Sequence, residues 1–148
     1  MNATYRKSRM VLVTGASSGI GEALAHCFAE AGHDLVLVAR SEDKLKTLAG
    51  ELHERHGVKV RVEPADLAQP GAPEQLAARL KRAHVSIDVL VNNAGVLSQG
   101  SFIRQDAATQ QQMIALNIAG LTAMLSAFVP PMVGRAQGRV LNVASIAA

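Results

Sequence analysis

The sequence contains little cysteine and few aromatic residues, and both shortages narrow the class of protein. Aromatic residues make up only 3% of the 148 residues, and tryptophan is absent. A hydrophobic core must therefore be built from aliphatic side chains, which is typical of parallel sheets covered by helices on both faces. The single cysteine, Cys27, cannot form a disulfide within the chain. A reducing compartment is therefore favoured.

Charged residues and long apolar runs are also scarce. Charged residues make up 18% of the chain, and the net charge is +3. The basic residues lack the interleaved aromatics of a nucleic-acid-binding surface, which argues against such a surface here. The apolar stretch after the basic N-terminal segment is too short for the core of a signal peptide, and no apolar run approaches membrane-spanning length. We therefore expect a soluble, cytoplasmic protein that binds neither nucleic acid nor membrane. No metal site is predicted.

Hydrophobic residues, by contrast, make up 49% of the chain, enough for one domain over residues 1–148 with a core of its own. Short apolar runs predict strands over residues 10–14, 34–39, 58–62, 87–91 and 139–143. Amphipathic spacing predicts helices over residues 20–31, 42–55, 74–83 and 107–128, the last closed near Pro130–Pro131. In the first helix, the apolar spacing falls on Ile20, Leu24, Cys27 and Phe28. The alternation predicts an α/β fold, a doubly wound parallel sheet of the Rossmann type with five parallel strands.

A glycine-rich turn lies between the first strand and the first helix. Its sequence is Thr14-Gly15-Ala16-Ser17-Ser18-Gly19-Ile20-Gly21. Such a turn lets a pyrophosphate approach the backbone and points the free N–H groups of the helix N-terminus at that anion. The hydroxyls of Ser17 and Ser18 are additional donors. Because the turn follows a strand and opens a helix, it predicts a phosphate cradle rather than a purely structural turn.

The turn resembles the T-G-x-x-x-G-x-G fingerprint of the short-chain dehydrogenase/reductase family. Later segments of that family's pattern follow in the same order along essentially the whole chain. They are Asp66-Leu67, Asn92-Asn93-Ala94-Gly95, Asn117, and the N-V-A-S segment that ends at Ser145. The resemblance implies an oxidoreductase that transfers a hydride between a nicotinamide cofactor and a carbonyl or alcohol substrate, and that forms homo-oligomers when complete.

The resemblance also assigns cofactor contacts. Asp66 is expected to hydrogen-bond the adenine amine, with the Leu67 backbone beside it; the alternative is a carboxylate that only caps its own loop. Asn93, Ala94 and Gly95 are expected to lie under the ribose and nicotinamide, and the asparagines to pin this turn to the first strand through Thr14.

The end of the second strand bears on cofactor choice. Folds that prefer NAD usually place an acidic residue about 20 positions beyond the glycine turn. Here that acid is absent, and the strand ends in Ala39-Arg40-Ser41. A guanidinium can hold a 2′-phosphate through bidentate, charge-assisted hydrogen bonds, and Ser41 can add a hydroxyl. We therefore expect NADP(H) to be favoured over NAD(H), the alternative being a solvated Arg40.

The catalytic set implied by the resemblance is incomplete. Asn117 matches the asparagine that holds a water in a proton relay, and Ser145 matches the serine that hydrogen-bonds the substrate oxygen. The family's Tyr-x-x-x-Lys motif occurs nowhere in the sequence, whose only tyrosine is Tyr5. The chain is thus interpreted as the cofactor-binding portion of such an enzyme, incomplete at its C-terminus and inactive alone.

Two consequences and two alternatives follow from this interpretation. The fifth strand is expected to become an open edge, and the chain to be marginally stable or prone to associate. One alternative is a non-catalytic nucleotide-binding or subunit-interaction module from a truncated gene. The other is a methyltransferase-like Rossmann domain, which Arg40 and the N-N-A-G turn disfavour.

Overall fold

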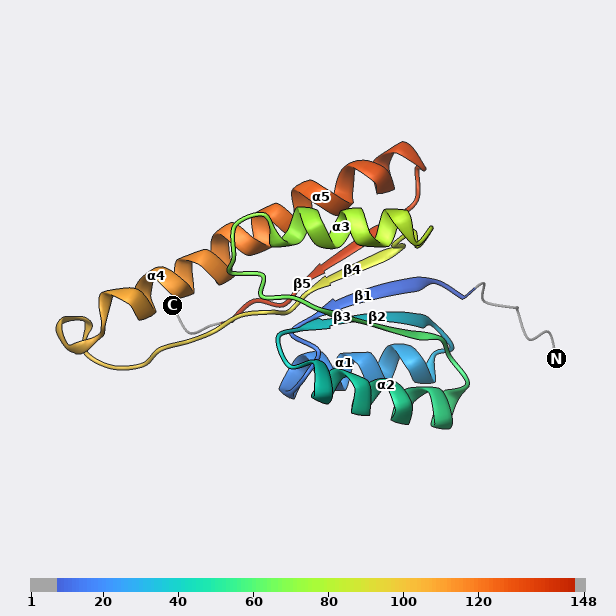
Figure 1. Ribbon diagram of the computed structural model, residues 1–148, viewed down its shortest axis with the longest axis horizontal. Coiled ribbons are helices and arrows are strands. Elements are labelled where there is room, and N and C mark those ends of the chain that lie inside the picture. Colours follow the sequence, from blue (N-terminus) through green and yellow to red (C-terminus); the bar gives the residue numbers. More distant parts are fainter. Residues whose placement is uncertain (1–7, 146–148) are drawn as a thin grey trace.

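In the computed structural model, which describes residues 8–145, a parallel sheet lies between two layers of helices (Figure 1). The strands are β1 (Met10–Thr14), β2 (Asp34–Ala39), β3 (Val60–Pro64), β4 (Val89–Asn92) and β5 (Arg139–Asn142). The helices are α1 (Gly19–Glu30), α2 (Glu42–His56), α3 (Ala72–Arg82), α4 (Ala107–Ile114) and α5 (Leu121–Gly134), with a π-helical segment η2 (Ala115–Gly120) joining the last two and a short 3₁₀ turn η1 (Phe102–Arg104) before them. All strand pairs are parallel, in the order β3-β2-β1-β4-β5. The predicted doubly wound fold is confirmed.

The sheet is buried on both faces because its central strands are continuously apolar. Alternate residues of each strand point to opposite faces, so Val11 and Val13 pack with the leucines of α2, while Leu12 packs with α3 and α5. Figure 1 shows the same division, with α1 and α2 on one side and α3 to α5 on the other. The helices α2 and α3 each bury a stripe of leucines against the sheet: Leu45, Leu48, Leu52, Leu76 and Leu80.

Helix α1 buries a different stripe from the one its large apolar residues predict. The buried residues are Gly21, Ala25 and Ala29, whereas Ile20 is 61% exposed and Cys27 is exposed. Small side chains let the helix approach the sheet closely, so the larger apolar residues are displaced to its flanks. Ile20 is thereby left at the helix N-terminus, at the carboxyl edge of the sheet.

Two strands begin later than predicted. β3 covers Val60–Pro64 and β4 begins at Val89, each start two residues beyond the expected one. Val58 and Ile87 are buried, but they lie in the loops that lead into these strands. Pairing with the neighbouring strand sets the bounds, since Val60 is in register with Leu35 and Val89 with Val11.

The long helix does not end at the proline pair. It continues through Pro130 and Pro131 to Gly134, because the helical φ of proline suits the last turns even though its N–H bonds are lost. The whole of Ala107–Gly134 is long and apolar enough, by length and composition, to cross a membrane, which corrects the expectation that no apolar run reaches that length. Met124, Phe128 and Met132 on one face of this helix are buried in the core.

The predicted open edge is present among the described residues. β5 pairs only with β4, and all its residues are exposed.

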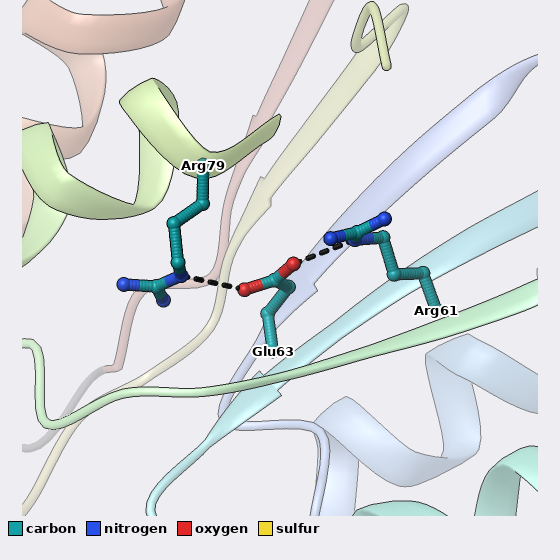
Figure 2. A network of polar contacts seen from close by, with 3 residues as sticks. All are labelled: Arg61, Glu63 and Arg79. Carbon is teal, nitrogen blue, oxygen red and sulfur yellow. Dashed lines mark hydrogen bonds and ion pairs between the residues drawn. The ribbon is translucent and has the colours of Figure 1, made fainter. Parts of the chain in front are cut away.

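A buried carboxylate ties β3 to α3 (Figure 2). Glu63, only 4% exposed, accepts a hydrogen bond from Nε of Arg79 on α3 at 2.8 Å and from Nε of Arg61 on its own strand at 2.6 Å. Burial alone raises the pKa of Glu63, but the hydrogen bonds from Arg79 and Arg61 outweigh burial and hold its pKa below the ordinary value. The carboxylate is therefore ionised, and it fixes α3 against the strand that leads to Asp66.

Candidate functional site

A pocket of about 650 Å³ opens at the carboxyl ends of the strands, where the sheet order reverses between β1 and β4. Ligands of open α/β sheets bind at this position. The lining brings together segments far apart in the sequence: the glycine-rich turn, the end of β2 with the start of α2, the segment after β3, and the turn after β4. The volume suits a small organic ligand or cofactor.

The turn at the N-terminus of α1 forms one wall of the pocket. Gly19 has a φ of +59° and no atom within 4 Å of the place where a Cβ would lie, so the backbone there is uncovered. The hydroxyls of Ser17 and Ser18 have no hydrogen-bond partner among the described residues, and the first N–H groups of a helix have no intrahelical acceptor. This wall can therefore donate several hydrogen bonds to a phosphate.

Gly21 allows the turn to close against the chain that follows β4. A Cβ on Gly21 would collide with the Gly15 carbonyl oxygen and the Asn93 side-chain amide. That amide donates to the carbonyl oxygens of Thr14 at 3.0 Å and Gly15 at 3.4 Å. The glycine thus makes room for the hydrogen bonds that join the two halves of the pocket floor.

The Thr14 hydroxyl is the centre of this floor. It donates to the Val91 carbonyl at 3.2 Å and accepts from the backbone N–H groups of Asn93 and Ala94, each at 2.9 Å. Thr14 is 1% exposed, so it lies beneath the pocket and does not line it. The structure therefore contains the expected contact between the N-N-A-G turn and the first strand. Asn92 is used differently, since its side chain donates to Asn142 of β5.

Two cations lie at the far end of the pocket. Arg40 and Ser41 line it, as does Lys44 in the first turn of α2. Among the described residues neither Arg40 nor Lys44 has an ion-pair partner, whereas the neighbouring Lys46 pairs with Glu42. Sequence reasoning missed Lys44. No sequence signal pointed to it, because only the fold shows that the first turn of α2 borders the pocket.

Asp66 and Leu67 form the part of the pocket wall that follows β3. The Asp66 carboxylate accepts from the Ala68 N–H and from Nε2 of Gln69, each at 3.1 Å, so it does cap its own loop. Lone pairs remain for a ligand. Leu67 is buried under α3 and α5, and its carbonyl touches Gly120 so closely that any Cβ there would collide with it. The π-helical segment therefore supports this wall from behind.

Asn117 lies in that π-helical segment and holds the other end of the pocket. Its Oδ1 accepts from the Val96 N–H at 2.9 Å and its Nδ2 donates to the Val96 carbonyl at 2.8 Å. The side chain therefore completes both backbone hydrogen bonds of a pocket-lining residue. π-helical segments often occur at functional sites, since they expose backbone carbonyls that a regular helix would use.

The other expected site residues are distributed as follows. Ser145 is exposed after β5 and is not among the residues that line the pocket, and Tyr5 is outside the described residues. Of the expected cofactor contacts, Thr14, Gly19 and Gly21 shape the pocket without lining it. The structure adds lining residues that were not expected: Val38, Ala39, Lys44, Ala65, Val96 and Leu116. Apart from Lys44 these residues are apolar, so their residue type gave no sign that they would border a ligand site.

Comparison with known sequences agrees with this geometry. Residues 9–148 match the model of a family described as short chain dehydrogenase. A dehydrogenase/reductase SDR family protein 7-like from Anopheles gambiae is 34% identical over 149 residues, which cover 98% of this chain and 47% of the relative. The chain spans about half the length of the curated relatives it matches.

Solved structures give the same result. A short-chain dehydrogenase from Sphingobium yanoikuyae in complex with NADPH is 40% identical with a TM-score of 0.86, covering 93% of this chain and 54% of that one. L-Sorbose reductase from Gluconobacter frateurii, complexed with NADPH and L-sorbose, is 33% identical with a TM-score of 0.87, covering 94% of this chain and 53% of that one.

Proposed function

The chain belongs to the short-chain dehydrogenase family, and we propose that its pocket binds NADP(H) as the cofactor-binding part of a carbonyl or alcohol oxidoreductase. The observation that carries the proposal is a pocket lined by the turn that opens α1 and by two cations, Arg40 and Lys44, without ion-pair partners among the described residues. A dinucleotide has a pyrophosphate in its middle and, in NADP, an extra phosphate on the adenosine ribose. The charges of the pocket match this distribution.

Each wall has a defined part in holding the cofactor. The α1 N-terminus with Ser17 and Ser18 receives the pyrophosphate, and Arg40, Ser41 and Lys44 receive the 2′-phosphate. Asp66 and Leu67 border the adenine. Asn93, Ala94 and Gly95 lie under the ribose and nicotinamide, held by Thr14.

When bound, NADP(H) would supply a hydride to the carbonyl carbon of the substrate, and the chain's residues would position the cofactor and the substrate oxygen. Asn117 would fix the backbone at Val96 on the nicotinamide side and hold a water there, and Ser145 would hydrogen-bond the substrate. Reduction also needs an acid to protonate that oxygen. No Tyr-x-x-x-Lys motif is present in the sequence to provide one, so we propose that these residues alone bind the cofactor without turnover.

The wider setting is also part of the proposal. Residues 1–148 would form part of one NAD(P)-binding domain, in a cytoplasmic protein that forms homo-oligomers when complete. Met124, Phe128 and Met132 of α5 pack in the core against the sheet, while most of the apolar helix Ala107–Gly134 is exposed or partly exposed. The second candidate function, a non-catalytic nucleotide-binding or interaction module, is favoured by one observation: the cradle is assembled while the acid is missing from the sequence.

The test is a binding titration with NADPH beside an assay of NADPH oxidation with a panel of ketones. Saturable binding with no oxidation above the rate without protein is the expected result. Oxidation that depends on the ketone would contradict the proposed inactivity. A folded sample that binds no NADPH would contradict the proposed function itself.

A further inference from the structure

A second cavity lies at the opposite end of the sheet, between the C-terminal ends of α3 and α5. These helices run side by side on one face of the sheet (Figure 1). The cavity has a volume of about 610 Å³, and we call it the α3–α5 groove. It shares no lining residue with the cofactor pocket. Its size is within the range of small-molecule sites.

The floor of the groove is apolar and its rim is basic. Leu80, Ile87 and Phe128 are buried lining residues, and Lys81, His84 and Arg135 are exposed lining residues. No carboxylate lines the groove. Among the described residues, none of these basic side chains has an ion-pair partner.

The carboxylate next to the groove is already engaged elsewhere. Asp88 follows Ile87, but its oxygens accept from the Met10 N–H at 3.0 Å and from Nε2 of Gln137 at 3.3 Å. Arg135 is held in place at the rim, since its Nη2 donates to the Ile87 carbonyl at 2.8 Å. The groove lining therefore carries the positive charges of Lys81 and Arg135 and no carboxylate, beside an apolar floor.

Backbone strain gives an independent reason to look for a role at His84. Helix α3 ends in a Schellman motif, with bonds from His84 N–H to the Lys81 carbonyl and from Val85 N–H to the Leu80 carbonyl. The position His84 occupies is usually glycine, and here φ is +55°. No hydrogen bond of the His84 side chain explains a histidine there among the described residues. The imidazole instead lines the groove, and its N–H can donate a hydrogen bond.

We propose that the α3–α5 groove binds a single-chain anionic amphiphile, a medium-chain fatty carboxylate. Its carboxylate contacts Lys81, His84 and Arg135, and its alkyl chain lies along Leu80, Ile87 and Phe128. Charge complementarity selects the head group, and the apolar floor selects the tail. No bond is formed or broken. The site is separate from the cofactor pocket, so it does not depend on the proposed function.

The test titrates the purified full chain with decanoate, decanol and acetate, without NADPH and with NADPH at saturation. Decanoate is expected to bind saturably at one site, with the same affinity in the presence of NADPH. Decanol and acetate are expected to bind at least tenfold more weakly, because each lacks one half of the ligand. Equal binding of decanol, or competition by NADPH, would overturn the proposal. So would the absence of saturable decanoate binding.

Two matched variants test whether the cations that line the groove, rather than the overall positive charge of the chain, bind decanoate. Lys81→Gln should weaken decanoate binding by about fivefold, an effect near 1 kcal/mol for one lost charge contact. Arg82→Gln, which removes a neighbouring cation that does not line the groove, should leave decanoate binding unchanged. Equal losses in both variants would overturn the proposal.

A second pair of variants separates binding from folding. His84→Gly relieves the left-handed strain, so it should raise Tm by about 2–4 °C while weakening decanoate binding. Ala136, with a φ of +50°, occupies the same position after α5 and does not line the groove. Ala136→Gly should raise Tm similarly and leave binding unchanged. Unweakened decanoate binding in His84→Gly would contradict the assignment of His84.

Co-sedimentation with anionic phosphatidylglycerol vesicles in place of decanoate binding would assign this face to a membrane instead and overturn the proposal.

Discussion

At the scale of single residues, the Thr14 hydroxyl joins the first strand to the turn after β4. It receives the partly buried N–H groups of Asn93 and Ala94 and donates to the buried carbonyl of Val91. Thr14→Val keeps the shape of the side chain but leaves these three backbone groups without their partner. We expect it to lower the free energy of unfolding by about 2–4 kcal/mol, measured by urea denaturation.

The matched control for this change is Thr47→Val. The Thr47 hydroxyl donates to the Asp43 carbonyl on the exposed face of α2. Since water can replace that bond, the loss should stay below about 0.5 kcal/mol. Equal losses at both positions would contradict the role assigned to Thr14.

Glu63 gives a prediction for pH. Because the arginines hold its folded-state pKa below the ordinary value of 4.5, the carboxylate stabilises the fold fully above that pH, and this contribution is lost as the pH falls through the folded-state pKa. Glu63→Gln should lower stability by about 1–2 kcal/mol at pH 7 and make it less dependent on pH in the acid range. Urea denaturation at pH 7 and below pH 4.5 measures both effects.

The control for Glu63→Gln is Glu51→Gln, an exposed residue of α2 with no ion pair among the described residues. It should leave both stability and its acid dependence unchanged. A parallel loss of stability with pH in wild type and Glu63→Gln would show that the network in Figure 2 does not carry the effect.

At the scale of elements, the π-helical segment η2 supports the wall of the pocket formed by Asp66 and Leu67. A Cβ on Gly120 would collide with the Leu67 carbonyl, which is backbone and cannot move aside easily. Gly120→Ala should therefore lower stability by about 1–3 kcal/mol and weaken NADPH binding, as measured by urea denaturation and titration.

Gly50→Ala is the control at this scale. Gly50 lies within α2 with no atom near the place of a Cβ, so alanine should raise stability by about 0.5–1 kcal/mol through its higher helix propensity. A stabilising Gly120→Ala would contradict the packing described for η2.

The elements also show where sequence reasoning succeeds and where it stops. β1, β2 and the helix starts were predictable because continuous apolar runs and the glycine turn have local causes, as Gly19 and Gly21 illustrate. The start of β3 was not, because pairing with Leu35 decides it rather than the burial of Val58. The π-helical segment was not predictable either, since it depends on contacts of Asn117 and Gly120 with distant backbone.

The candidate site divides in the same way. That the glycine-rich turn and Arg40 border one pocket was predictable, because their residue types and their spacing along the first strand–helix–strand segment indicate it. Lys44 and Val96 were missed, because only the folded chain shows that the start of α2 and the turn after β4 border one cavity. The same holds for the α3–α5 groove, whose lining comes from separate helix ends.

At the scale of the whole molecule, apolar surface is concentrated beyond β4. Val140 and Leu141 on the edge strand are each 41% exposed, and Ile118 on the adjoining helix is 61% exposed. Edge strands with apolar side chains pair readily with other chains. We expect the 148-residue chain to self-associate as its concentration rises, measured by analytical ultracentrifugation.

Val140→Lys should reduce this association, since a charge on an edge strand opposes pairing. Leu97→Lys serves as control, because Leu97 is 60% exposed but lies on the loop after β4 and not on the edge strand itself. Association that is unchanged by Val140→Lys and reduced by Leu97→Lys would place the contact elsewhere.

The central claim is that this chain holds a cradle built for NADP(H). The most direct measurement is calorimetric titration with NADPH and NADH of the wild type, Arg40→Ala and Arg40→Ala/Lys44→Ala. We predict that the wild type binds NADPH at least about tenfold more tightly than NADH, through charge-assisted contacts to the 2′-phosphate. The variants should lose NADPH affinity stepwise while NADH affinity stays unchanged. Equal affinities for both cofactors in the wild type, or equal losses of both in the variants, would contradict the account.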